Sequence, residues 1–255
     1  MSGRPAHQVA PACFELHDVQ VRLGPANQLL ALNGLNLRIE AGERVALVGA
    51  NGSGKSTLLR TLHGLQRISA GQLHARPGQR VAMLFQRPHL LRLSALRNVM
   101  LGLWLQGLPW SQARLQAQQA LQRVDLAALA ARNARALSGG QQQRLALARA
   151  WATQPEVWLL DEPTASLDPQ SRREVETLIA GFSTAPPRSD GTPSWPATLV
   201  FSSHNLAQVR RLASRVIYLE QGQLLADLPA HDFFNHQLLQ ALCPPAYWFT
   251  QGESA

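Results

Sequence analysis

The residues from Gly49 to Ser56 have the types and the spacing of a phosphate-binding loop. Their sequence, GANGSGKS, matches G-x-x-x-x-G-K-[ST] and lies between an apolar run and a helix-compatible segment. The glycines permit backbone angles at which successive N–H groups point toward phosphate oxygens. Lys55 is the only lysine of the chain, and its compact ammonium suits a narrow loop better than the planar fork of arginine. We therefore expect Lys55 to bind phosphate and Ser56 to hold Mg²⁺.

Two adjacent carboxylates follow another apolar run, VWLLDE at 157–162. A buried parallel strand would deliver Asp161 to its C-terminal edge, where ligands bind in open α/β sheets. Asp161 can then join the Mg²⁺ shell, and Glu162 can orient or deprotonate an attacking water. By itself an apolar run ending in Asp-Glu is often an ordinary strand end, but a phosphate-binding loop upstream favours the chemical interpretation.

A second anion-binding helix start is indicated by LSGGQQQR at 137–144. Ser138 is a candidate N-cap, and the two following glycines let backbone amides approach an anion. The alternative is an ordinary capped helix start with a glycine turn. The segment would thus be a second phosphate-binding helix start, although it has no lysine.

The elements that must position these residues follow from the hydrophobic pattern. Alternating apolar residues predict two half-buried strands, one over 14–23 and one around 35–39. Short continuous apolar runs, each expected to precede a loop and a helix, predict a parallel sheet covered on both faces. These runs are 44–49, 81–86, 157–162, 198–203 and 215–220.

Two other stretches differ from this pattern. Residues 94–153 are rich in Ala, Leu, Gln and Arg, with Pro109 as the main break, and predict a helical subdomain inserted into the α/β core. Residues 183–197 carry four prolines and predict a long surface loop.

The composition limits which kinds of partner and which cellular compartment we expect for the protein. The formal charge of +8 suggests an anionic partner, but the arginines are spread along the chain, which favours general arginine usage instead. Cys13 and Cys243 have no metal-ligand spacing, and we expect both to be reduced bystanders. With no signal-peptide pattern and no apolar run long enough to span a bilayer, we expect a soluble, cytoplasmic protein that sits on a membrane protein.

Taken together, the motifs resemble those of the nucleotide-binding subunits of ABC transporters. GANGSGKS resembles the Walker A loop, LSGGQ the family signature, VWLLDE the Walker B strand and SLD at 166–168 the D-loop. Gln86 and His204 stand where the family has its Q-loop glutamine and switch histidine. The resemblance implies a P-loop NTPase fold of class α/β. It has a parallel sheet, an N-terminal antiparallel β subdomain and a helical subdomain at about 87–153. The ATPase domain would span 12–235, with a short C-terminal tail at 236–255.

The resemblance also implies roles for particular residues. Glu162, His204 and Gln86 would be catalytic, and Ser56, Gln86 and Asp161 would hold Mg²⁺. Leu23 stands where the family usually has an aromatic residue that stacks on adenine, so the stacking contact is replaced by an apolar one. The other residues expected to contact ATP are Gly49, Asn51, Gly52, Ser53, Gly54, Lys55, Ser56, Thr57, Ser138, Gly139, Gly140, Gln141 and Asp168.

The expected assembly is likewise implied by the resemblance. Two copies would sandwich two ATP molecules head to tail, so that the signature of one chain completes the site of the other. The dimer would act on two transmembrane permease subunits at the cytoplasmic face of the inner membrane, with a periplasmic solute-binding protein involved indirectly. Residues 87–103 would dock on the permease.

The expected solute is the least specified feature. The segments 84–99 and 210–234 most resemble the ATPases of tungstate importers, followed by those of phosphate and polar amino-acid importers. An ABC exporter ATPase shares the same motifs and stays open. A non-transport ABC ATPase acting on nucleic acid would need coiled-coil arms, a zinc hook or two tandem cassettes, none of which the sequence contains.

Overall fold

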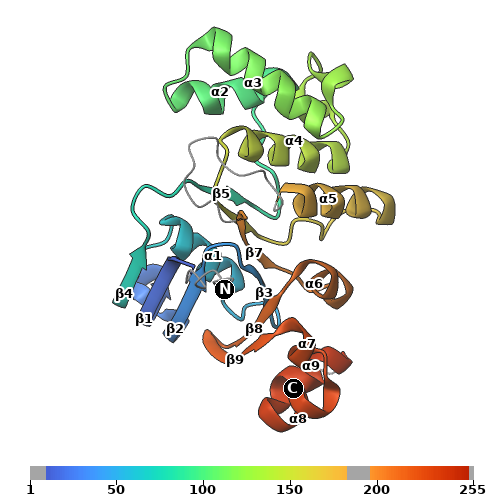
Figure 1. Ribbon diagram of the computed structural model, residues 1–255. Coiled ribbons are helices and arrows are strands. Elements are labelled where there is room, and N and C mark those ends of the chain that lie inside the picture. The colour runs from blue at the N-terminus through green and yellow to red at the C-terminus, as the bar shows by residue number, and fades with distance from the viewer. Residues whose placement is uncertain (1–9, 183–195, 253–255) are drawn as a thin grey trace, which may run out of the picture.

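The computed structural model describes residues 10–182 and 196–252 (Figure 1). The surface loop predicted at 183–197 therefore lies outside the described residues, apart from its last two positions.

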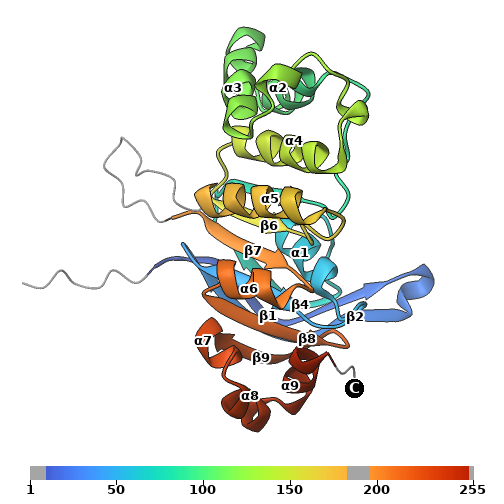
Figure 2. The ribbon, with the colours of Figure 1, turned by 90° about the vertical axis from the view of Figure 1, so that its right-hand side faces the viewer.

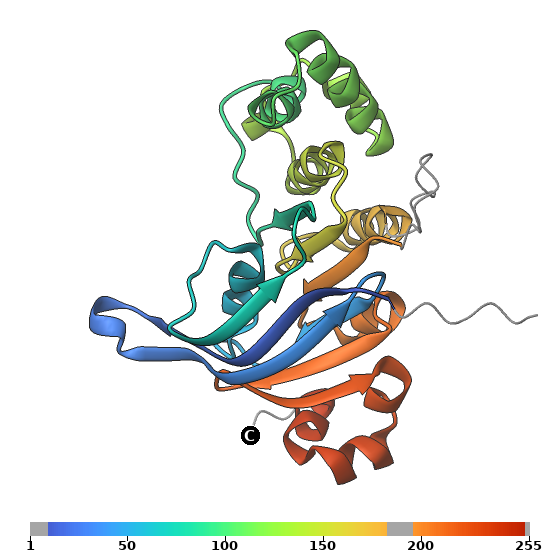
Figure 3. The ribbon, with the colours of Figure 1, turned by 60° about the vertical axis from the view of Figure 1, so that its left-hand side comes forward.

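A three-stranded antiparallel sheet contains the N-terminal segment. β1 (Ala12–Leu23) pairs with β2 (Leu29–Glu40) on one side and β4 (Ala70–Ala75) on the other, and the short 3₁₀ helix η1 (Pro25–Asn27) joins β1 to β2. The long β1–β2 pair reaches away from the rest of the chain (Figure 3). Both of these strands were predicted from alternation. β4 was not, because nearly all of its side chains are exposed and the sequence shows no alternation there.

A six-stranded sheet forms the centre of the molecule, and it confirms the predicted α/β class. Its order is β5-β6-β7-β3-β8-β9, and the first five strands are parallel. Their bounds are β3 (Arg44–Val48), β5 (Val81–Leu84), β6 (Val157–Leu160), β7 (Thr198–Ser202) and β8 (Arg215–Glu220).

The expectation that a loop and a helix follow every apolar run is wrong for 215–220. β8 turns directly into the antiparallel edge strand β9 (Gln223–Pro229). The turn residues Gln221 and Gly222 both have positive φ, 47° and 79°. Two such residues make a tight hairpin turn whose twist matches the strands.

Helices cover both faces of the large sheet. Alternate residues of β3 enter different hydrophobic cores: Ala46 and Val48 pack in one cluster, and Val45 and Leu47 in the other. The covering helices include α1 (Lys55–His63), α5 (Pro169–Phe182) and α6 (Leu206–Leu212), and α5 lies beside α6 (Figure 2). Burial on both faces explains why the core strands are continuous apolar runs.

The predicted helical insert lies at one end of the molecule (Figure 1). It contains α2 (Ala95–Leu105), α3 (Trp110–Arg123), η2 (Ala127–Leu129), η3 (Ala134–Ala136) and α4 (Gly139–Ala152). Pro109 is the N-cap of α3, so this residue separates two helices as its sequence position suggested.

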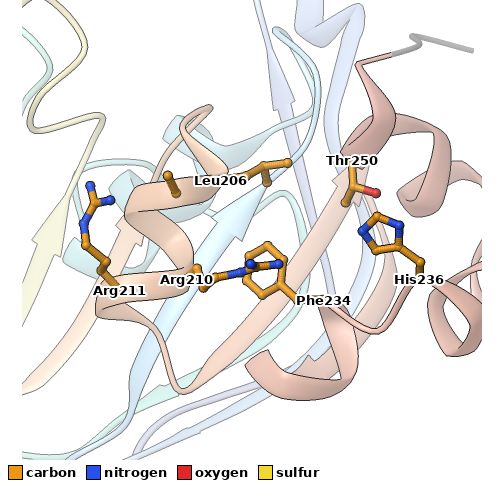
Figure 4. A pocket seen from close by; sticks show the side chains of 7 residues that line it. Leu206, Arg210, Arg211, Phe234, His236 and Thr250 are labelled. Atoms are coloured by element: carbon orange, nitrogen blue, oxygen red, sulfur yellow. The ribbon is translucent and has the colours of Figure 1, made fainter.

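Three short helices follow β9 at the opposite end: α7 (Ala230–Phe233), α8 (His236–Leu242) and α9 (Pro244–Gln251). Cys243 and Ala246 are buried among them. The guanidinium of Arg210 in α6 lies 4.5 Å from the ring centroid of Phe234, and this contact joins the C-terminal helices to α6 (Figure 4). Within the ranges 10–182 and 196–252, no helix combines the length and the hydropathy that crossing a bilayer requires.

Candidate active site

The predicted phosphate-binding loop connects β3 to α1 and is packed tightly against other backbone. Gly49, Gly52 and Gly54 have φ of 139°, 80° and 104°, a region that favours glycine. A Cβ at Gly49 would lie 2.1 Å from the carbonyl oxygen of Leu219, and one at Gly54 would lie 2.8 Å from that of Ala31. Both glycines are therefore required sterically, whatever ligand the loop binds.

The β8–β9 turn supports this loop through a backbone hydrogen bond, a role that the sequence did not suggest. The N–H of Gly222 donates to the carbonyl of Ser53 at 3.1 Å, and the N–H of Asn33 donates to the carbonyl of Gly222 at 2.8 Å. A Cβ at Gly222 would lie 2.8 Å from the carbonyl oxygen of Ala31. The only sequence signal for this contact was the Gln-Gly pair itself.

Lys55 lies inside the loop, with only 5% of its surface exposed. Its ammonium donates to the carbonyls of Gly49 and Ala50 at 2.8 Å each, and its nitrogen lies 3.4 Å from the hydroxyl oxygen of Ser53. Burial lowers the pKa of Lys55, and the nearby carboxylates of Glu162 and Asp161 oppose that shift. A phosphate in the loop would offer this buried cation a stronger partner than neutral carbonyls do.

The hydroxyl of Ser56 donates to Oδ1 of Asp161 at 2.9 Å. The structure thus brings together two residues 105 positions apart in the sequence. A hydroxyl and a carboxylate at the end of β6 are oxygen donors of the kind that Mg²⁺ binds.

Ser202, at the end of β7, joins the two adjacent carboxylate residues. Its fully buried hydroxyl donates to Oδ1 of Asp161 at 2.8 Å and accepts from the backbone N–H of Glu162 at 2.9 Å. Sequence reasoning missed Ser202, because a serine inside the run TLVFSS looks like part of the strand.

Glu162 is held between the two other predicted catalytic residues. Its Oε2 accepts from the amide of Gln86 at 3.0 Å, and its Oε1 lies 2.8 Å from Nε2 of His204. Glu162 has φ of +45°, an uncommon value for a residue with a side chain. Gln86 follows β5 and His204 follows β7, so three neighbouring strand ends converge on one carboxylate.

A buried polar network lies behind His204. The hydroxyl of Ser203 lies 2.7 Å from the side-chain oxygen of Gln208, and the Gln208 amide donates to Thr164 at 2.9 Å. Asn205 caps α6 by accepting from the N–H of Gln208. These residues, with Glu162 and His204, line a cavity of about 590 Å³. The sequence did not predict that Ser203, Gln208, Thr164 or Asn205 belongs to the site.

The segment around Ser138 confirms the predicted N-cap. Ser138 and Gln141 form a capping box: the hydroxyl of Ser138 accepts from the N–H of Gln141, and the Gln141 side chain accepts from the N–H of Ser138. A Cβ at Gly140 would lie 2.5 Å from the hydroxyl oxygen of Ser171 in α5, whereas Gly139 faces open space.

The structure does not bring this helix start to the phosphate loop of the same chain. α4 packs on α5 and β5, whereas α1 lies against β2, β5, β6 and β7 (Figure 2). Among the described residues, Asp168 likewise forms no hydrogen bond with the loop. It accepts from the backbone N–H groups of Gln170 and Ser171 at 3.0 Å each, and hydrogen bonds from Ser171 lower its pKa. Both segments therefore have free sides that could face another molecule.

The remaining predicted nucleotide contacts lie in the loop, at the start of α1 and at the end of β1. Asn51 is exposed, Thr57 is half-buried on α1, and Ser53 is buried. Leu23 lies half-buried at the end of β1, opposite Leu29. A further cavity of about 340 Å³ between α6 and the C-terminal helices (Figure 4) contains none of the predicted site residues.

Comparison with protein families gives a match to the model described as ABC transporter over residues 32–165. The chain is 37% identical over 221 residues to the methionine import ATP-binding protein MetN of Caulobacter vibrioides, a match that covers 81% of this chain and 64% of that relative. It is 42% identical to the phosphonates import ATP-binding protein PhnC of Stutzerimonas stutzeri, covering 78% of this chain and 79% of that relative.

Comparison with solved structures also finds ATP-binding cassettes. The dimeric, post-hydrolysis ATP-binding cassette MJ0796 bound to ADP and Pi superposes with a TM-score of 0.74 and 28% sequence identity. The alignment covers 85% of this chain and 98% of that one.

Proposed function

This chain belongs to the ABC transporter family as an ATP-hydrolysing subunit, and we propose that it is of the importer type and energises the uptake of an oxyanion, with tungstate as the favoured solute. The ATPase domain that we propose spans 12–235, with the helical subdomain at about 87–153. The observation that carries the proposed mechanism is the position of Glu162, which lies within hydrogen-bond distance of both Gln86 and His204.

We propose that the loop Gly49–Thr57 binds the phosphates of ATP and that Lys55 exchanges its loop carbonyls for phosphate oxygens. Water then attacks the γ-phosphorus, the bond to the β–γ bridging oxygen breaks, and ADP and phosphate form. Glu162 accepts the proton of the attacking water, and His204 and Gln86 orient its carboxylate.

A hydroxyl, a carboxylate and an amide from Ser56, Asp161 and Gln86 are the donors that would hold Mg²⁺. Ser56 and Asp161 fit this role because their oxygens already lie 2.9 Å apart at the strand ends. Bound there, the ion would neutralise charge on the phosphate oxygens. Ser202 also orients the Asp161 carboxylate, because its hydroxyl donates to the same Oδ1 as that of Ser56.

We further propose a head-to-tail dimer in which Ser138, Gly139, Gly140, Gln141 and Asp168 of one chain complete the ATP site of the other. The separation of α4 from α1 within one chain supports this proposal, because the signature helix start has no phosphate site in its own chain. Leu23 would contact the adenine by apolar packing only, so selectivity for adenine would be loose.

Partners other than the second copy would be two transmembrane permease subunits, with a periplasmic solute-binding protein acting through them. Residues 87–103 are the proposed docking segment, and Leu91 is 45% exposed there beside the exposed Arg92. Docked in this way, the protein would lie peripherally on the cytoplasmic face of the inner membrane. Nucleic acid is not among the proposed partners.

The proposed solute rests on resemblance, because no residue of an ATPase subunit touches the cargo. The phosphonate-import relative supports an anionic solute, and the methionine-import relative supports the alternative of an amino acid. Phosphate import and an exporter role are the further alternatives.

Solute accumulation in native-host cells tests this assignment. Cells with wild-type protein or Lys55→Ala would be supplied with trace tungstate, and the uptake of molybdate, phosphate, methylphosphonate and methionine would be measured in parallel. We expect Lys55→Ala to abolish tungsten accumulation alone. If tungsten accumulation were unchanged and the uptake of another solute were lost, tungstate would be rejected as the solute, and the proposed ATPase mechanism would stand.

A further inference from the structure

We propose that Arg172 binds the phosphate product as it leaves Glu162, at the junction of two cavities that form an exit route between α5 and α6. This inference rests on the proposed ATP hydrolysis. It adds a product site to that reaction, and the ligand is inorganic phosphate.

The route consists of two adjoining cavities. The inner one, about 590 Å³, is lined by Glu162, His204 and Arg172 among others. The outer one, about 660 Å³, lies between α5 and α6. Arg172 and Asn205 line both cavities, so they stand where one opens into the other. A phosphate released beside Glu162 would meet Arg172 before it reached the outer groove.

The hydrogen-bonding capacity of Arg172 is largely unused. Within the part of the chain that the structure describes, its buried Nε has no hydrogen-bond partner and its guanidinium pairs with no carboxylate. Among the described residues, its side chain makes one hydrogen bond, a long contact of 3.5 Å from Nη2 to the carbonyl of Leu167. A buried N–H without a partner is costly, and a bidentate oxyanion is the ligand that a guanidinium fork matches best.

The other charged groups along the route favour outward movement of an anion. Glu162 lies at the inner end and would repel the product. Glu176 is the carboxylate of the outer cavity, and it is neutralised by Arg211, whose guanidinium donates to it at 2.7 Å. Arg173 adds a further positive charge to the outer wall.

Neutral donors complete the inner cavity. The hydroxyls of Thr164 and Ser203 and the amides of Asn205 and Gln208 line it together with Arg172. The Ser203 hydroxyl and one N–H of Gln208 already donate within the buried network, so the donors that remain can solvate an oxyanion only weakly. Arg172 is therefore the residue on which the affinity of this route for phosphate depends.

The test compares Arg172→Gln with Arg173→Gln, a neighbouring arginine on α5 that lines only the outer cavity. The binding of radiolabelled inorganic phosphate to full-length protein loaded with ADP and Mg²⁺ would be measured by equilibrium dialysis. Loss of a charge-assisted hydrogen bond predicts at least about tenfold weaker phosphate binding in Arg172→Gln, with Arg173→Gln within about twofold of wild type. Arg172→Lys, which keeps the charge but loses the fork, should fall between.

Equal phosphate affinity in wild type and Arg172→Gln would overturn the inference, as would an equal loss in Arg173→Gln. If Arg172→Gln failed to fold, unchanged affinity in a folded Arg172→Lys would overturn it in the same way. ATP hydrolysis by wild type is assayed separately. Its absence would contradict the proposed function, whereas the dialysis result judges the phosphate site on its own.

Discussion

The serine hydroxyl of Ser202 links the two adjacent carboxylate residues of the site. It donates to Asp161 and accepts from the backbone N–H of Glu162, the residue with φ of +45°. Backbone strain of this kind persists where the surroundings over-determine it. Ser202 is therefore a positioning residue. It holds the backbone of Glu162 and so determines the point from which the Glu162 side chain extends into the site.

Replacing Ser202 by alanine should lower kcat for ATP hydrolysis about tenfold or more, because two hydrogen bonds that orient the carboxylate residues are lost. KM for ATP should change little, since Ser202 does not reach the phosphate loop. Steady-state kinetics checks this against Ser203→Ala, a buried serine that contacts neither carboxylate. An equal loss of kcat in both variants would mean that the effect is general destabilisation.

The pKa of Lys55 provides a second prediction for an individual residue. Burial lowers it from the usual 10.5, so in the free protein the amine should lose its proton at a lower pH than an exposed lysine does. Bound ATP brings negative charge, favours the ammonium and should raise the pKa. The pH dependence of acetylation at Lys55, read by peptide mass spectrometry, measures both values without interference from other lysines. A midpoint at or above 10.5 without ATP, or no upward shift with ATP, would contradict this account.

Among the elements, the start of α4 combines a structural and a proposed binding role. The capping box of Ser138 and Gln141 satisfies backbone donors at the helix start. The same N-terminus is the part that we propose to contact the partner's ATP. A substitution can separate the two roles, because aspartate is as good an N-cap as serine but carries a negative charge.

Ser138→Ala should reduce the free energy of unfolding by about 1 kcal/mol, whereas Ser138→Asp should be close to wild type in chemical denaturation. In contrast, Ser138→Asp should weaken ATP-dependent dimerisation more strongly than Ser138→Ala, since its carboxylate would face a phosphate. Nucleotide-driven dimerisation that is equal in the two variants would argue against phosphate contact at this helix start.

The strands also show which parts of the fold could be predicted from the hydrophobic pattern of the sequence. β1, β3 and β5–β8 were predictable, because burial on one or both faces leaves alternating or continuous apolar runs. Most side chains of β4 and β9 are exposed, so the sequences of these two strands carry no hydrophobic signal. β9 matters for the site nonetheless, because its turn supports the phosphate loop through Gly222.

For the molecule as a whole, the candidate site divides into residues that the fold assembles and residues that it keeps apart. Lys55, Ser56, Asp161, Glu162, Gln86 and His204 converge because they follow neighbouring strands of one sheet. That convergence follows from parallel-sheet geometry, so the sequence could predict it. Ser202 and the Ser203–Gln208–Thr164 network could not be predicted, because hydrogen bonding between buried polar side chains depends on three-dimensional register.

Ser138 and Asp168 lie outside that convergence in the isolated chain. The head-to-tail dimer is the arrangement in which they would meet a phosphate loop, and closure would then depend on the γ-phosphate of ATP. The whole account therefore depends on an ATP-driven association of two copies.

Light scattering of Glu162→Gln in ATP and Mg²⁺ tests that claim most directly. The variant should bind ATP, hydrolyse it very slowly and accumulate as a dimer of about twice the 27.9 kDa chain mass, while Lys55→Ala, the matched control, stays monomeric. A dimer that forms with ATP and disappears with ADP is the predicted result. A Glu162→Gln protein that stays monomeric while ATP is bound would contradict the composite site.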